Sequence, residues 1–119
     1  MPTSVLVVDD HQSFRRLAAR LLGEAGFAVV GEAVDAASAL REVARLRPDV
    51  VLLDVMLPDR SGLAVAAELA AAAAAPRVVL TSSRSRSDFG RSFEWPAGCT
   101  FVPKHELSGA GLTALLHQP

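Results

Sequence analysis

An unbroken apolar run that ends in an acid constrains this chain more than any other feature. Residues 50–53 are Val-Val-Leu-Leu, and Asp54 follows directly. Apolar runs without alternation are typical of a strand covered on both faces, at the centre of a parallel sheet. Pro58 and Gly62 then indicate a loop. Asp54 is therefore predicted at the carboxyl end of a central strand, where open α/β sheets bind their ligands. Its alternative role is to cap the next helix, for which Ser61 is better placed.

The rest of the chain alternates between predicted strands and predicted helices. Further apolar runs predict strands over residues 4–8, 27–34, 77–80 and 100–102, with 27–34 at an edge of the sheet. Apolar residues at helical spacing predict helices over residues 14–25, 36–44, 63–75 and 107–116, the last one broken early by Gly109 and Gly111. This alternation predicts a doubly wound α/β fold with right-handed crossovers and a five-stranded parallel sheet. The order 2-1-3-4-5 is chosen because it places the acids of strand 1 beside Asp54.

Size and composition exclude several classes of protein. The chain has 119 residues, one cysteine and three scattered histidines, so we expect a single domain over residues 1–119 without a disulfide or a zinc site. A net charge of −1 and dispersed arginines give no basic stripe for nucleic acid. No signal peptide or membrane span is recognisable, so we expect a soluble, cytoplasmic protein.

Three carboxylates are expected to converge at the carboxyl edge of the sheet. Asp9 and Asp10 follow the first strand as Asp54 follows the third. At a separation of about 5 Å and an effective dielectric of about 20, each pair would repel by roughly 3 kcal/mol, so a counter-charge is needed. Oxygen ligands, including the Met56 carbonyl, suit Mg²⁺, whose coordination is completed by water and phosphate oxygens.

A bound phosphoryl group would also involve residues at the ends of the fourth and fifth strands. Asp54 is the natural nucleophile, because a carboxylate held by Mg²⁺ can attack phosphorus in line. The hydroxyl of Thr81 can hydrogen-bond one phosphoryl oxygen, and the ammonium of Lys104 can neutralise another. Lys104 is the single lysine in a chain that otherwise uses arginine, which favours a functional role over an ordinary surface charge.

Four motifs, in order and at matching spacing, resemble the receiver domain of two-component response regulators: VVDD, LLDVMLPDRSGL, VVLTS and FVPK. The resemblance covers nearly the whole chain and implies a CheY-like fold. It implies that a sensor histidine kinase or a phosphotransfer protein phosphorylates Asp54. It further implies that Asp10 and the Met56 carbonyl bind Mg²⁺ directly, and that Asp9 supports the ion through water.

The resemblance also implies a switch and a set of partners. Thr81 and Phe101 would be the switch pair, and the alternative for Phe101 is a plain core position. The domain would be a signalling domain, an enzyme only in catalysing its own phosphorylation and dephosphorylation, and would form a homodimer on activation. VVDDHQSFR and VPKHEL are similar to receivers that precede a LuxR-type helix-turn-helix domain; whether one follows Pro119 is left open.

The chain departs from the family pattern at two places. His105 stands where many receivers have proline, so we expect a trans Lys104–His105 peptide. Residues 84–98 match least well; we expect at most a two-turn helix over residues 87–93, with Trp95 covering Phe89 and Phe93. The alternative for Trp95 is an exposed position that contacts a partner.

Rival functions are less well supported. A haloacid-dehalogenase-type enzyme needs a second Asp two residues after its nucleophile, where this chain has Met56 or His11. A dinucleotide or P-loop enzyme needs a glycine-rich turn between strand and helix, which is lacking. The alternative that stays open is a receiver-like interaction module that acts without phosphorylation.

Overall fold

A computed structural model describes residues 2–84, 88, 95–96 and 98–116. Its five parallel strands have the order β2-β1-β3-β4-β5, which confirms the predicted topology. The strands are β1 (Ser4–Val8), β2 (Ala28–Ala33), β3 (Val50–Asp54), β4 (Arg77–Ser82) and β5 (Cys99–Pro103). The helices are α1 (Gln12–Glu24), α2 (Ala36–Leu46), α3 (Gly62–Ala70) and α4 (Gly109–Leu116), and a 3₁₀ turn, η2 (Lys104–Glu106), follows β5.

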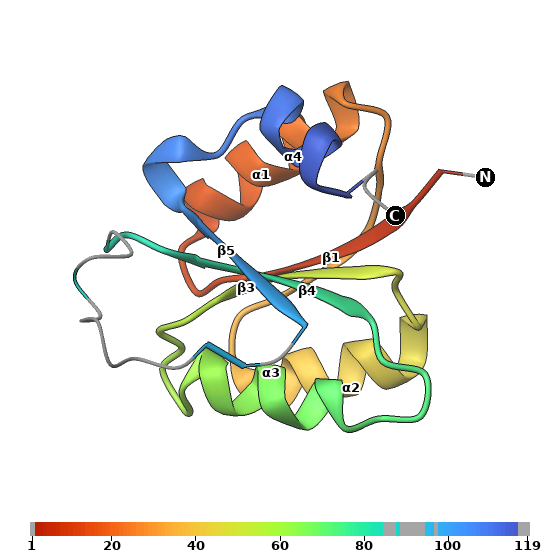
Figure 1. The fold of residues 1–119 in the computed structure, drawn as a ribbon, viewed down its shortest axis with the longest axis vertical. Coiled ribbons are helices and arrows are strands. Elements are labelled where there is room, and N and C mark those ends of the chain that lie inside the picture. Colours follow the sequence, from red (N-terminus) through yellow and green to blue (C-terminus); the bar gives the residue numbers. More distant parts are fainter. Residues whose placement is uncertain (1, 85–87, 89–94, 97, 117–119) are drawn as a thin grey trace.

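Helices cover both faces of the sheet. α1 and α4 lie on one face, and α2 and α3 lie on the other (Figure 1). Each face has its own apolar core, and β3 is buried along its whole length between them. β2 forms an edge, as predicted, and its Val30 is exposed. The unbroken apolar run of residues 50–53 is thus explained by burial on both faces.

Several helix boundaries differ from the predictions, most of all the end of α3. α3 ends at Ala70, although the alanine run continues to Ala75. Residues 71–75 are exposed, so high helix propensity is not supported there by packing. In addition, Pro76 disfavours a helical Ala75, and the chain must turn back because Arg77 pairs with Val50.

The last helix begins at Gly109 rather than at residue 107. Leu107 is extended, and the Ser108 hydroxyl accepts a hydrogen bond from the Gly111 N–H at 3.0 Å. Gly109 and Gly111 therefore lie in the first turn and do not break the helix, because that turn has few intrahelical bonds to lose.

α1 also starts earlier than predicted, at Gln12. Fewer of its apolar residues are buried than their helical spacing would allow. Leu17 lies three residues after Phe14, at helical spacing, but is 39% exposed. Ala18 and Leu22 are the buried residues of the helix. Gly26 follows the helix with a φ of +92°, which favours glycine.

Part of the segment before β5 cannot be compared with its prediction. The helix expected over residues 87–93, and the stripe of Phe89 and Phe93, lie outside the described residues apart from Asp88. Trp95 is half-buried, and its ring centroid lies 4.5 Å from that of Phe101. The described residues contain no cis peptide bond, so the Lys104–His105 peptide is trans, as expected.

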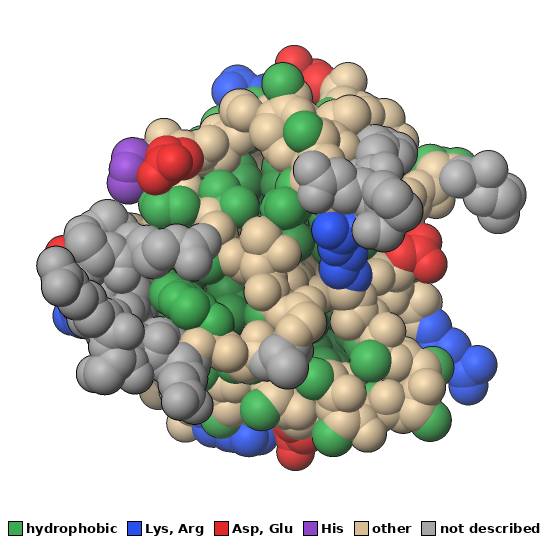
Figure 2. Space-filling view, viewed as in Figure 1, with side chains coloured by type: hydrophobic (Ala, Val, Ile, Leu, Met, Phe, Trp, Pro, Cys, Tyr) green, Lys and Arg blue, Asp and Glu red, His purple; other side chains and the backbone are tan. Residues whose placement is uncertain are grey.

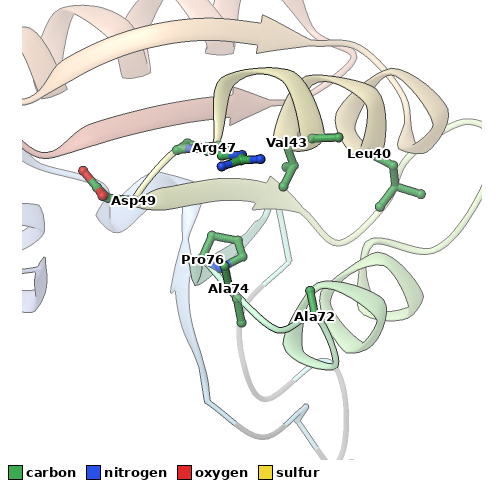
Figure 3. A pocket seen from close by; sticks show the side chains of 10 residues that line it. Leu40, Val43, Arg47, Asp49, Ala72, Ala74 and Pro76 are labelled. Carbon is green, nitrogen blue, oxygen red and sulfur yellow. The ribbon is translucent and has the colours of Figure 1, made fainter.

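One hollow of the domain lies far from the predicted site. It has a volume of about 790 Å³ and lies between α2 and residues 72–76, at the amino ends of the strands (Figure 3). Its lining is mostly alkyl, with Arg47 and Asp49 as the ionisable residues. A smaller hollow of about 200 Å³ lies between β5 and α4, where hydrophobic side chains are visible at the surface (Figure 2). No described helix is both long and apolar enough to cross a membrane.

Candidate functional site

The parallel strands bring four of the predicted residues to one edge of the sheet. Asp9 directly follows β1, Asp54 ends β3, and Lys104 directly follows β5. Thr81 lies in β4, opposite Asp54 in the strand register. Because all strands run in the same direction, their carboxyl ends meet, and the predicted cluster forms.

Asp54 is almost completely buried, with 3% of its surface exposed. Its Oδ1 accepts a hydrogen bond from the Met56 N–H at 3.0 Å. Burial raises the pKa of the Asp54 carboxyl, the nearby charge of Asp9 raises it further, and the Met56 N–H and Lys104 oppose this rise. The Ser61 hydroxyl accepts from the Leu63 N–H at 3.1 Å, so Ser61 is the cap of α3 and Asp54 is not.

Lys104 supplies the positive charge within the site. Its Nζ lies 2.6 Å from Asp9 Oδ2 and 3.4 Å from Asp54 Oδ2. The shorter contact is an ion pair whose alignment is not that of a hydrogen bond. Nζ also lies 4.5 Å from the centre of the Phe14 ring, which is a cation–π distance. The ammonium is therefore held between two carboxylates and an aromatic face.

His11 is a member of the cluster that the sequence analysis missed. Its backbone N–H donates to Asp9 Oδ1 at 2.8 Å. Its Nδ1 lies 3.1 Å from Asp9 Oδ1 and 3.2 Å from Asp10 Oδ1. The available signal was its position directly after the acid pair, where α1 begins.

Potential metal ligands converge as expected. Asp9, Asp10, His11 and Asp54 each offer an atom, and these four atoms all lie within 4.8 Å of one another. Three carboxylates around one point suit a hard cation that prefers oxygen ligands and retains water, such as Mg²⁺. The donor set therefore fits Mg²⁺, and the partly exposed Asp10 leaves one side open to solvent.

Met56 and Gly62 shape the loop beside these carboxylates. Met56 forms a bridge with Ser61, and its side chain is 55% exposed, so its backbone is the part near Asp54. A Cβ at Gly62 would lie 2.0 Å from the Asp54 carbonyl oxygen. Because backbone atoms cannot yield that space cheaply, glycine is required where the loop returns to α3.

The Thr81 hydroxyl is buried and has no hydrogen-bond partner among the described residues. Leaving a buried hydroxyl unpaired costs about 1–3 kcal/mol. The Thr81 carbonyl is satisfied, because it accepts from the Val55 N–H at 2.9 Å. A polar group in this position, level with Asp54, is suited to bind an oxygen of a group attached to Asp54.

Phe101 lies in the core, with 5% of its surface exposed. It packs against Trp95 and belongs to the core on the α2 and α3 side of the sheet. The core position agrees with one of the two predicted roles. Its movement as a switch stays a prediction.

Comparisons with known proteins agree with this geometry. Residues 5–107 match the response regulator receiver domain family. The chain is 49% identical over 83 residues to protein-glutamate methylesterase/protein-glutamine glutaminase 5 of Myxococcus xanthus, covering 69% of this chain and 24% of that protein. It is 38% identical over 108 residues to the transcriptional regulatory protein PdtaR of Mycobacterium tuberculosis, covering 91% and 53%.

A solved structure resembles the fold over nearly its whole length. The signal receiver domain of the response regulator NarL from Mycobacterium tuberculosis has a TM-score of 0.79 and 29% identity, covering 97% of this chain and 93% of that chain. The present chain spans about a quarter of the methylesterase and about half of PdtaR. From the matched residues and the site, the chain belongs to the response regulator receiver domain family, the signalling domain of two-component systems.

Proposed function

We propose that this domain accepts a phosphoryl group on Asp54 in an Mg²⁺-dependent reaction. The observation that carries the proposal is the meeting of three groups at adjacent strand ends. These are the buried Asp54 carboxylate, the Lys104 ammonium 3.4 Å from it, and the Thr81 hydroxyl opposite it in the register, which has no hydrogen-bond partner among the described residues. A nucleophile, a cation and a hydrogen-bond donor are the parts that phosphoryl transfer requires.

In the proposed reaction, a carboxylate oxygen of Asp54 attacks the phosphorus of a phosphohistidine. The new P–O bond forms as the P–N bond breaks, and the histidine nitrogen leaves with the electron pair and takes a proton from solvent. Lys104 neutralises one phosphoryl oxygen, and Thr81 donates its hydroxyl to another. Mg²⁺, held by Asp10, Asp54 and the Met56 carbonyl with Asp9 in support, would neutralise charge that develops on the transferred group. Water later attacks the phosphorus, the P–O bond to Asp54 breaks, and the Asp54 carboxylate and inorganic phosphate are released as a proton passes to solvent.

The donor and the response belong to the same proposal. We infer that a histidine kinase or a phosphotransfer protein supplies the phosphoryl group in the cytoplasm. Bonding of Thr81 to the phosphoryl group would move its side chain, and Phe101 would follow into the vacated space and favour a homodimer. Such a shift needs a differential affinity of a few kcal/mol between the two states.

Acetyl phosphate tests the reaction without a known kinase. Incubation with Mg²⁺ should add one phosphoryl group with the hydrolytic lability of an acyl phosphate, which mass spectrometry locates at Asp54. The Asp54→Asn variant should remain unmodified. Asp49→Asn, at the opposite end of the same strand, should be modified like the wild type. Modification of Asp54→Asn would refute the assignment, and an unmodified wild type would favour an interaction module that acts without phosphorylation.

Beryllofluoride tests the switch separately. Structures with and without Mg²⁺ and beryllofluoride should show Thr81 contacting the mimic and Phe101 in a different rotamer. An unchanged Phe101 rotamer would leave this residue a core position only.

A further inference from the structure

Asp59 connects the loop after Asp54 to a different part of the domain. Its Oδ1 accepts a hydrogen bond from the Ala36 N–H at 2.8 Å, and its Oδ2 accepts from the Ala37 N–H at 3.1 Å. Ala36 and Ala37 are the first two residues of α2, where backbone N–H groups have no partner within the helix. One carboxylate in the β3–α3 loop therefore bridges to a helix that precedes it by 23 residues in the chain.

α2 already has a cap of its own. Asp35 Oδ1 accepts from the Ser38 N–H at 2.8 Å, and the Ser38 side chain bonds back to the Asp35 backbone, which completes a capping box. Asp59 and Asp35 thus satisfy different N–H groups of the same helix end. What Asp59 adds to this cap is an attachment between α2 and the loop.

The same loop carries the backbone that contacts the phosphoacceptor. The Met56 N–H donates to Asp54 Oδ1 at 3.0 Å, and Met56 forms a bridge with Ser61. Asp59 lies between the two bridged residues, at the exposed turn of the loop. α2 packs against one face of the sheet. The two hydrogen bonds from α2 to Asp59 therefore hold this turn at a set position relative to the sheet.

We infer that Asp59 is a positioning residue for cation and phosphoryl binding. It holds the β3–α3 loop on α2, so that the Met56 backbone is in place beside Asp54 before a cation arrives. Preorganisation of this kind raises affinity, because the loop is not ordered at the moment of binding. The inference rests on the proposed function, since Met56 is taken to contribute its carbonyl to the cation.

The attachment also has a consequence at α2. Two coupled events affect each other equally, so binding beside Asp54 should strengthen the bonds between Asp59 and the helix. The amides of Ala36 and Ala37 should then exchange with solvent more slowly when Mg²⁺ and beryllofluoride are bound. The amide of Ser38, held by Asp35, should change less.

The test compares two carboxylates that bind the same helix end. Asp59→Ala removes the attachment, and Asp35→Ala removes a cap of the same helix without touching the loop. Mg²⁺ titration, followed by the amide NMR signals of Asp10 and Met56, should show the Kd of Asp59→Ala raised about tenfold, the usual loss when a residue that supports a metal ligand is removed. The Kd of Asp35→Ala should stay within about twofold of the wild type. Asp59→Asn keeps one oxygen acceptor and should show a smaller loss.

Thermal denaturation verifies that each variant is folded, and Asp59→Asn takes the place of Asp59→Ala if the latter is not. Equal Mg²⁺ affinity in Asp59→Ala and the wild type would overturn the inference. So would equal losses in Asp59→Ala and Asp35→Ala, because the effect would then come from the stability of α2. A wild type that binds no Mg²⁺ would refute the proposed function itself.

Discussion

The two ends of β3 each carry an aspartate, and their surroundings differ. Asp49 precedes the strand and is exposed, and its Oδ2 accepts hydrogen bonds from the Ser4 N–H at 2.9 Å and the Ser4 hydroxyl at 3.0 Å. Asp54 ends the strand and is buried beside Asp9 and Lys104. The first carboxylate has neutral hydrogen-bond donors and is open to solvent. The second depends on charged partners, which makes it responsive to a cation or a phosphoryl group.

The hollows of the domain show the same contrast. The large hollow at the amino ends of the strands is lined mainly by alkyl groups (Figure 3), while the charged cluster lies at the carboxyl ends. The candidate site is therefore identified by the convergence of potential metal ligands at the carboxyl ends, and not by the volume of a hollow. Four predictions test this difference between the ends, in order of decreasing effect.

The largest effect is expected for Lys104→Met without Mg²⁺. The change keeps the side-chain length but leaves Asp9 and Asp54 buried without their ammonium. Loss of one partner of a buried ion pair typically costs about 3 kcal/mol of unfolding free energy, measurable by urea denaturation in a chelator. Added Mg²⁺ should restore part of the loss. Arg60→Gln removes the exposed pair with Glu68 and should cost less than about 0.5 kcal/mol; similar losses in both variants would contradict the prediction.

The second-largest effect is expected when a predicted metal ligand is removed. We expect Asp10→Asn to weaken Mg²⁺ binding by about ten- to a hundredfold, which corresponds to about 1.4–2.7 kcal/mol. Asp49→Asn changes an aspartate outside the cluster and should leave Mg²⁺ affinity unchanged. Calorimetric titration of both variants checks this, and a comparable loss in Asp49→Asn would mean that general charge, rather than ligation, sets the affinity.

Asp54→Asn should stabilise the protein when Mg²⁺ is absent. Burial raises the pKa of Asp54 in the folded state, so the folded protein prefers the protonated form and ionisation opposes folding at pH 7. An uncharged amide of similar shape should therefore raise the unfolding free energy, which urea denaturation in a chelator measures. A less stable Asp54→Asn protein would contradict this expectation.

The pH dependence of stability in the wild type also tests whether ionised Asp54 opposes folding. The contribution of Asp54 to stability should rise as the pH falls through its raised pKa, above the ordinary value of 3.8. Hydrogen bonds lower the pKa values of Asp35 and Asp59, so their contributions are complete above 3.8 and are lost only at lower pH. Thermal denaturation from pH 7 to pH 4 should show the rise in the wild type and not in Asp54→Asn.

The smallest effect on stability is expected in the alanine run, which lies near the amino ends of the strands. Ala73 lies outside α3, so Ala73→Gly should change the unfolding free energy by less than about 0.5 kcal/mol. Ala67 is an exposed residue inside α3, and Ala67→Gly should cost about 1 kcal/mol. Equal losses would mean that the helix continues through the run.

Strand positions and the principal site residues followed from local patterns. Apolar runs without alternation need cover on both faces, and helices between them need right-handed crossovers, which predicts a doubly wound parallel sheet. The order 2-1-3-4-5 needed a further condition, that the acids after the first strand lie beside Asp54. Asp9, Asp54 and Lys104 directly follow or end such runs, and parallel strands bring such positions together. The distances and the burial of these groups were not predictable from the runs.

Features that depend on two distant elements were missed. The contact of Phe14 with Lys104 depends on how α1 is rotated against the sheet, and the bond from Asp59 to Ala36 depends on where α2 starts beside a loop. The end of α3 depended on a competition between alanine's propensity and the pairing of Arg77 with Val50. Helix propensity differs by less than about 1 kcal/mol per residue, so such contacts readily override it.

The sequence by itself determined which residues can react, because the order of acids, hydroxyl and lysine after successive apolar runs sets which groups reach the carboxyl edge of a parallel sheet. Tertiary structure alone decided how they are charged and held. Burial beside Asp9 raises the pKa of Asp54, and packing places the Lys104 ammonium between two carboxylates. The Thr81 hydroxyl is buried with no hydrogen-bond partner in the part of the chain that the structure describes. Solvation and electrostatic interaction depend on distances between groups far apart in the chain, and these distances exist only once the chain has folded.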